Sequence, residues 1–292
     1  MNAITSVIAE NWRQQGILVV PFMDSVRMEP KRLQPHYHEF FQLFFLEGRA
    51  AVMHDFVEFH VEGSSLFFMS PGQIHTANPE PGLRGTTVSF TQDFFDHHAP
   101  PPSQLFEFPY FLTDGASPWL QIPRTQASEI ASLLAEMQRE FDSALSGAAT
   151  VLRALLHLLL VRAGRMHAEC HPPRSVTRAA QVMRQFRLAV EQHFREWHQV
   201  EPYARLLEIS PNHLHDLVRE QSGHAAGEII RERRLLDAKR LLLHSDLDIS
   251  EIGYHLGFKD PSYFGRFFRK AACRTPAQFR EEIREKYQQK PL

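Results

Sequence analysis

The sequence contains little cysteine. Cys170 and Cys273 are the only two among 292 residues. Two cysteines cannot build the disulfide framework of a small secreted domain or a zinc site made of four thiolates. Such cysteine usage is typical of a reducing compartment, so we expect a cytoplasmic protein.

Long apolar runs are also missing. The most apolar stretch, residues 151–161, contains Arg153 and is shorter than the roughly 20 residues that span a bilayer. The first residues, MNAITSVIAENWRQQG, have no basic start followed by an apolar core, so we expect no secretory signal and no membrane partner. Glycine-rich phosphate loops, Ser/His/Asp groupings and paired-carboxylate motifs are absent as well, which excludes the commonest enzyme signatures.

The net charge of −2 conceals an asymmetry between the two parts of the chain. Residues 174–292 hold 21 Lys and Arg against 16 Asp and Glu, a balance of +5, whereas residues 1–173 hold 11 against 18, a balance of −7. A basic part joined to an acidic part suggests that only the second part meets a polyanion.

The first 124 residues have the pattern of a β-rich domain. Between residues 17 and 95, short apolar runs alternate with turn residues at Glu47-Gly48, Glu62-Gly63 and Pro71-Gly72. Many short strands at such spacing predict a small barrel or sandwich. We therefore expect a β-barrel domain over residues 1–124.

Residues 125–168 have a helical pattern instead. Apolar residues recur at spacings of three and four, and a second apolar run follows the Ser146-Gly147 break. The two helices carry more apolar surface than one small barrel needs. A dimer interface and simple packing on the barrel both fit this surplus. Residues 169–176 contain two adjacent prolines and are expected to form a linker to a helical domain over residues 177–292.

The helical domain contains an internal repeat at an offset of fifty residues. Ser210–Arg219 aligns with Asp260–Arg269, and each begins with a helix-capping residue followed by proline at the first helical position. Matched apolar positions are expected to face the core: Leu214 with Phe264, Leu217 with Phe267 and Val218 with Phe268.

Each repeated helix follows a shorter helix across a tight turn, with a small residue at Ala204 or Gly253 that permits a close crossing. This is the helix-turn-helix layout, in which the second helix enters the major groove of DNA. Residues 225–243 read as one helix about 28 Å long, which suits two reading helices in successive grooves about 34 Å apart. Its five basic residues are expected to divide between the protein interior, phosphate contacts and the solvated surface.

The stretch ISEIGYHLGFKDPSYFGRFFRKAACRTPAQFR, residues 249–280, resembles the signature of the AraC/XylS family of bacterial transcription regulators. The resemblance covers about the last 110 residues. It departs from the family pattern at Gly253, where alanine is usual, and at Cys273, where a helix-ending glycine is usual.

The resemblance implies the residues that contact DNA. Base-reading positions fall on Asn212, His215 and Asp216 in the first copy, and on Ser262, Tyr263 and Arg266 in the second. Arg266 suits bidentate pairing with guanine, whereas Asp216 can only accept, for example from a cytosine amine, or is simply a surface residue. Arg219 is a further outward position of the first copy, and Arg269 and Lys270 are expected to anchor phosphates.

Two segments of the first domain look like the halves of a cupin motif, PHYHEFFQ at 35–42 and PGQIH at 71–75. We expect His36, His38, Gln42, Phe44 and His75 to line a ligand pocket without a metal or cofactor. Neutral histidines can also hold zinc or iron, although Gln42 stands where a glutamate ligand is usual. The many phenylalanines of this domain also fit an aromatic ligand.

These observations lead to one prediction of class and function. The fold is α+β and multidomain: an N-terminal cupin-like β-barrel with a helical dimerisation segment, then an all-α domain with two helix-turn-helix motifs. By resemblance, the function is sequence-specific DNA binding that regulates transcription, controlled by a small molecule. The partners are duplex DNA, a small-molecule effector, a second copy of the chain and, for an activator, RNA polymerase. The alternative is a metal-dependent cupin oxygenase or isomerase with a helical appendage.

Overall fold

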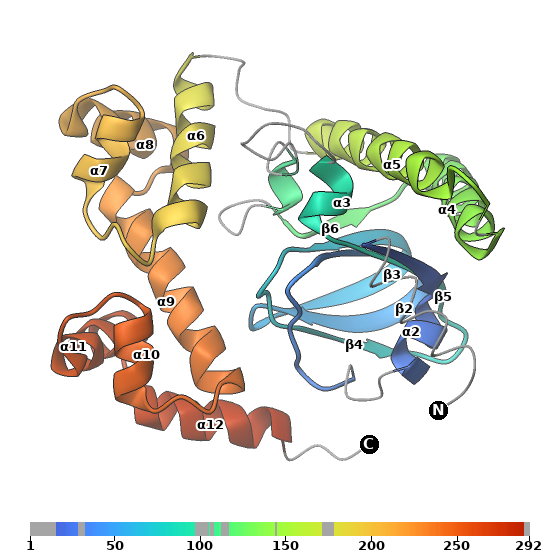
Figure 1. The fold of residues 1–292 in the computed structure, drawn as a ribbon. Coiled ribbons are helices and arrows are strands. Elements are labelled where there is room, and N and C mark those ends of the chain that lie inside the picture. Colours follow the sequence, from blue (N-terminus) through green and yellow to red (C-terminus); the bar gives the residue numbers. More distant parts are fainter. Residues whose placement is uncertain are drawn as a thin grey trace. The chain divides into compact units, whose positions relative to one another are not determined.

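A computed structural model describes residues 16–28, 33–96, 105, 108–111, 117–143, 145–170 and 178–288. The chain forms two compact units (Figure 1). Among the described residues, the first unit runs to Cys170 and the second begins at Arg178. No helix in these ranges combines the length and the apolar character needed to cross a membrane. The predicted boundaries at residues 124, 168 and 176 remain predictions.

The first unit is built on an antiparallel sheet. Its strands are β1 (Ile17–Pro21), β2 (Phe41–His54), β3 (Val57–Met69), β4 (His75–Pro79), β5 (Arg84–Phe90) and β6 (Trp119–Gln121). The order is β1-β5-β2-β3-β6, and β4 pairs with β2. Three short helices accompany the sheet: α2 (Phe22–Met28), α3 (Gln92–Asp96) and the 3-10 helix η3 (Pro109–Phe111). The predicted antiparallel β region is therefore confirmed.

Strand β2 explains why the sequence FQLFFL is almost continuously apolar. Side chains alternate across a strand, and both faces of this sheet are covered. Phe41 and Phe45 belong to the core that also contains helices α4 and α5, whereas Phe44 packs with Phe22 of α2 on the other face. Gln42 shares the Phe44 face, so one polar group points into an aromatic interior.

Two predicted turns are wrong. Gly48 and Gly63 pair with each other inside a single long hairpin of β2 and β3. Both have positive φ, 133° and 84°, so they bend the hairpin without ending its strands. The chain reverses instead at Asp55-Phe56, where both residues have positive φ, as a two-residue hairpin turn requires. The first part of the PHYHEFFQ segment precedes the sheet strand, because β2 begins at Phe41.

Helices α4 (Arg124–Ser143) and α5 (Ala148–Cys170) lie along the sheet of the first unit (Figure 1). The apolar residues that recur at spacings of three and four along α4 are all buried: Ile130, Leu133, Leu134, Met137 and Phe141. Tyr110 of η3 donates its hydroxyl hydrogen to the carbonyl oxygen of Leu160 at 2.7 Å. Packing on the sheet thus uses most of the apolar surface, but Val151 and Leu158 on α5 each remain 40% exposed.

The second unit contains only helices among its described residues. They are α6 (Arg178–His193), α7 (Val200–Leu206), α8 (Pro211–Ser222), α9 (Ala226–His244), α10 (Ile249–His255), α11 (Pro261–Ala272) and α12 (Pro276–Gln288). The pairs α7–α8 and α10–α11 form the two expected helix-turn-helix motifs, and α9 connects them (Figure 1). Each pair has its own apolar cluster.

The repeat is present as predicted. Ser210 accepts a hydrogen bond from the His213 N–H at 3.2 Å, and Asp260 accepts one from the Ser262 N–H at 2.7 Å. In both copies proline occupies the first turn. Of the matched apolar pairs, all members are buried except Phe267, which is half-buried.

The glycine at 253 has a physical explanation. A Cβ placed on Gly253 would lie 3.2 Å from the Cβ of Phe264. In the first copy, Ala204 crosses under the smaller Leu214, and both are buried. Compared with the first copy, the second copy has a larger residue on the second helix, Phe264 in place of Leu214. It has a smaller one on the first helix, Gly253 in place of Ala204.

The other departure from the family pattern lies at the end of α11. Cys273 adopts a left-handed conformation with φ of 59°, and Gly223 ends α8 at the matching position with φ of 79°. A side chain makes this conformation unfavourable, whereas glycine adopts it freely.

We predict that Cys273→Gly stabilises the protein by about 0.5–1 kcal/mol, because the relief of backbone strain exceeds the added entropy of the unfolded chain. Urea unfolding followed by circular dichroism measures this change. The matched Gly223→Ala variant should lose a similar amount. A less stable Cys273→Gly protein would show that the cysteine side chain contributes a contact of its own.

Candidate DNA-binding surface and ligand pocket

The first candidate reading surface lies along the outward side of α8. Asn212, Asp216 and Arg219 are exposed there, and His215 is half-buried. Leu214, Leu217 and Val218 occupy the opposite face and fix the helix to its core. The structure thus presents all four predicted polar side chains from one helix, in a position open to a partner.

The second candidate reading surface lies on α11. Tyr263 is 62% exposed, and the guanidinium carbon of Arg266 lies 4.4 Å from the centre of its ring. Ser262, Arg269 and Lys270 are exposed as well. The Ser262 backbone N–H lowers the pKa of Asp260, the helix cap, so the cap remains ionised at neutral pH. Arg266 therefore reaches outward beside an exposed aromatic ring.

Several other arginines of this unit have structural partners. Arg280 and Arg284 of α12 donate to the carbonyl oxygens of Leu247 and Ser245, each at 2.7 Å. Arg274 pairs with Glu282. The basic residues of α9 are also more buried than the sequence suggested, because Arg233, Arg234 and Arg240 are buried and Lys239 is half-buried, which leaves Arg231 exposed. Much of the basic surplus therefore stabilises the fold.

The predicted ligand-binding residues come together in the first unit. A small pocket that opens to solvent is lined by Phe22, Ser25, Val26, His36, Gln42, Phe44, His75 and Ala77. His38 adjoins it, with its ring centre 4.9 Å from that of His75. His36 lies 4.3 Å from His75 by the same measure. The five residues thus surround one space, although His36 and His38 reach it from a loop.

The protons on these imidazoles can be assigned from their backbone contacts. In each ring Nδ1 lies against a carbonyl oxygen two residues away: Gln34 for His36 at 2.9 Å, Phe40 for His38 at 2.7 Å and Gln73 for His75 at 3.1 Å. A carbonyl oxygen only accepts, so each Nδ1 carries a proton. Nε2 of His38 lies 3.2 Å from the amide oxygen of Gln42. Of the three rings, only that of His75 has an Nε2 that the described residues leave as a free acceptor.

His75 is the most informative of the three. It is 1% exposed, and its Nε2 is buried without a hydrogen-bond partner among the described residues. Burial, and then the neighbouring His38 and His36, lower its pKa well below the usual value, so the ring is neutral near pH 7. The pocket therefore offers a buried hydrogen-bond acceptor that lacks a donor.

The pocket has no positive charge to match a carboxylate. No lysine or arginine is among the described lining residues. Among the arginines of the first unit, Arg27 pairs with Asp24 and Arg49 pairs with Glu62, both on the surface. Arg84 is exposed, and Arg32 lies outside the described residues. The described part of the pocket thus favours an uncharged ligand.

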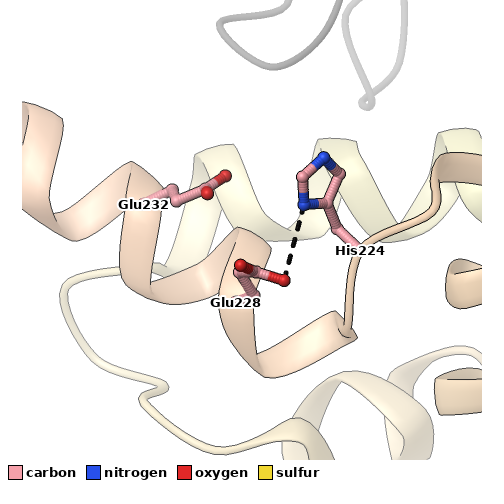
Figure 2. Close-up of side chains that lie close together, drawn as sticks. All are labelled: His224, Glu228 and Glu232. Atoms are coloured by element: carbon pink, nitrogen blue, oxygen red, sulfur yellow. Dashed lines mark ion pairs between the residues drawn. The ribbon is translucent and has the colours of Figure 1, made fainter. Parts of the chain in front are cut away.

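Within the described ranges, one group of three His, Cys, Asp or Glu residues brings its ligating atoms within 4.8 Å of one another: His224, Glu228 and Glu232 (Figure 2). His36, His38 and His75 do not meet this distance. Local structure accounts for two members of this group. Glu228 accepts a hydrogen bond from the Ala225 N–H at 3.3 Å and pairs with His224 at 3.4 Å. Such a pattern caps a helix.

Two family models match the chain. The AraC-like ligand binding domain matches residues 27–160, and a helix-turn-helix domain matches residues 203–282. Together they include most of the chain, and they match the sheet-bearing unit and the helical unit respectively.

Individual regulators match most of the chain or a part of it. The HTH-type transcriptional activator RhaS of Escherichia coli O157:H7 is 25% identical over 269 residues, which cover 82% of this chain and 95% of RhaS. The HTH-type transcriptional regulator GlxA of Rhizobium meliloti is 43% identical over 77 residues, 26% of this chain and 24% of GlxA. A third regulator, YijO of Escherichia coli K12, is 35% identical over 91 residues, 31% of this chain and 32% of YijO. The chain thus spans a third or less of GlxA and YijO.

Two solved structures resemble parts of the chain. The DNA-binding domain of AdpA, crystallised with a target DNA, is 28% identical over 38% of this chain and 97% of that domain, with a TM-score of 0.34. ToxT of Vibrio cholerae O395 is 14% identical over 86% of this chain and 92% of ToxT, with a TM-score of 0.43.

The two family matches fall on the two units described above, and the signature residues of α10 and α11 lie where the repeat requires them. This chain is a member of the AraC/XylS family of transcription regulators, with an AraC-like ligand-binding domain followed by a helix-turn-helix domain.

Proposed function

We propose that the chain is a cytoplasmic, sequence-specific DNA-binding regulator of transcription, without enzymatic activity, whose state is set by a small molecule in the first unit. One observation carries the proposal. Two helices with matching caps present polar side chains outward from a single helical unit, and α9, with 19 residues, separates them by about 28 Å. That length is close to the spacing of successive major grooves.

Roles on the DNA follow from the chemistry of each exposed group. Arg266 pairs with a guanine edge, because its two parallel N–H groups match O6 and N7. Asn212 and Ser262 suit base edges near the start of each helix, with His215 and Tyr263 beside them. Asp216 accepts from a cytosine amine. Arg219, Arg269 and Lys270 bind phosphates and set the register.

We predict that Arg266→Ala weakens binding to a duplex selected by the wild-type chain by about 10–100-fold and relaxes the base preference at one position. Lys270→Ala should weaken binding to all duplexes alike and reduce the slope of log K against log salt by about 1. Fluorescence anisotropy across a salt series measures both effects. Arg139→Ala, an exposed arginine on α4, is the control and should change neither. The absence of salt-sensitive DNA binding at micromolar wild-type protein would overturn the proposal.

The effector is expected to be an uncharged small molecule that donates a hydrogen bond. Nε2 of His75 can only accept, and a donor from the ligand would satisfy it. Phe22 and Phe44 line the same space, with their rings edge to face at 5.5 Å. We therefore propose a flat apolar ligand with a hydroxyl or neutral N–H group, recognised by His36, His38, Gln42, Phe44 and His75.

Matched pairs of small molecules test this ligand class. Benzyl alcohol should raise the melting temperature of the full chain in a thermal-shift assay, whereas benzoate at the same concentration should not, because its charge would be buried without a cation. His75→Phe should abolish the shift. A larger shift with benzoate would contradict the proposed class. Stoichiometric iron or zinc in the purified chain, lost in His36→Ala, would instead favour the cupin enzyme.

We further propose that the exposed apolar side of α5 forms a homodimer interface. Val151 and Leu158 lie seven residues apart and therefore on the same side of the helix. Leu145, just before α5, is 67% exposed. A dimer would place two helical units on one operator, and contact with RNA polymerase would follow in an activator.

We predict that Leu158→Glu converts the proposed dimer to a monomer, as measured by light scattering. The variant monomer should remain folded, because the side chain at this position is partly exposed in a single chain. Val57→Glu, a 55% exposed position at a hairpin tip, serves as the control and should leave the mass unchanged. A dimer mass for Leu158→Glu would place the interface elsewhere.

A further inference from the structure

Helix α9 carries charged side chains in the interior of the helical unit. Arg233, Arg234 and Asp237 are 8%, 5% and 5% exposed. A buried charge is unfavourable unless a partner neutralises it and its hydrogen-bonding groups are used. The partners of these three residues therefore indicate what the charges do in the fold.

Arg233 and Asp237 face α6 and the segment between α6 and α7. Arg233 Nε lies 2.8 Å from a carboxylate oxygen of Glu191 on α6, and its guanidinium carbon lies 3.9 Å from the ring centre of Phe194. Asp237 receives Arg195 Nε at 3.0 Å. These contacts connect α9 to α6 and to the segment that leads to α7.

Arg234 faces the second motif. It donates to the carbonyl oxygen of Leu256, the residue that ends α10, at 3.0 Å. Its guanidinium carbon lies 4.2 Å from the ring centre of Phe258 and 5.3 Å from that of Phe267 on α11. Burial lowers the pKa of Arg234 to about 10, so the group remains charged at neutral pH. Neighbouring residues on α9 thus contact two different places: Arg233 contacts the part of the unit that leads into the first motif, and Arg234 contacts the second motif.

The segment that leads into the first motif also touches the second motif directly beside this pair. Gly257 has φ of 78°, and a Cβ at this position would lie only 2.2 Å from the carbonyl oxygen of Arg195. The ring of His198 stacks on that of Phe258 with their centres 6.0 Å apart. At the matching position of the first copy, Glu208 adopts φ of 55° and is exposed. The second turn thus needs glycine for its close contact as well as for its conformation.

We propose that Arg233, Arg234 and Asp237, together with Gly257, form a junction that locks the two helix-turn-helix motifs into one rigid reading unit. The junction fixes the distance and the rotation between α8 and α11, so the protein selects DNA segments with one spacing. This role rests on the proposed DNA-binding function, whereas the rigidity itself is a property of the free protein. Arg233, Arg234, Asp237 and Gly257 are positioning residues, because they act through α8 and α11.

Spin labels measure the rigidity without DNA. Labels are placed at Glu220→Cys on α8 and Ala271→Cys on α11, both exposed positions, in a full chain carrying Cys170→Ser and Cys273→Ser. We expect one narrow distance distribution by double electron–electron resonance. Arg234→Met should at least double its width, and Gly257→Ala should do the same.

Controls separate rigidity from folding. Arg231→Ala, an exposed arginine on the same helix, should leave the narrow distribution unchanged. If circular dichroism shows that Arg234→Met does not fold, Arg195→Ala replaces it. This variant removes the ion pair with Asp237, from a side chain that is 47% exposed. It should broaden the distance distribution while retaining helicity. A distribution as narrow as the wild type in the folded variants would overturn the proposal.

A DNA experiment tests the consequence. A duplex selected by the wild-type chain is compared with one that carries five additional base pairs between the two contacted segments. We expect the wild type to lose at least 100-fold in affinity for the longer duplex, and Arg234→Met to lose less than 10-fold. Equal losses for both proteins would overturn the proposed spacing control. If the wild type selects no duplex, the proposed DNA-binding function is wrong. The proposed rigidity is then tested by the spin-label distances alone.

Discussion

A buried guanidinium group must have partners, and this requirement organises the helical unit. Arg233 and Arg234 lie in the interior of a helix that joins two otherwise similar motifs. Their partners are a carboxylate, a carbonyl oxygen and aromatic faces, which come from α6 and the segment after it on one side and from the second motif on the other. Each motif has its own apolar cluster, and the buried arginines of α9 contact residues of both clusters. The reading surfaces on α8 and α11 inherit their relative placement from these contacts.

The elements with strong local signals were predictable from the sequence. The caps at Ser210 and Asp260, the prolines that follow them and the paired apolar positions all have short-range causes, and the structure bears them out. The apolar stripe of α4 was equally clear, because its period of three to four residues survives in the packed helix. The connecting helix was also found within one residue at each end.

Other features depended on contacts that are distant in sequence. Gly48 and Gly63 look like turn residues until their pairing across β2 and β3 is known. The arginines of α9 looked like a partly solvated face, because nothing local indicates that Glu191 or Leu256 lies against them. In the pocket, the motif spacing suggested which residues gather there. The tautomers of the histidines and the lack of a nearby cation required the fold.

The depressed pKa of His75 has a consequence for a sensor. A ring that remains unprotonated through the physiological range keeps the same hydrogen-bonding character whatever the acidity of its surroundings. Protonation would convert its acceptor nitrogen into a donor only at a pH well below the usual histidine range. Recognition through His75 would then report the concentration of the bound molecule, undisturbed by small changes of pH near neutrality.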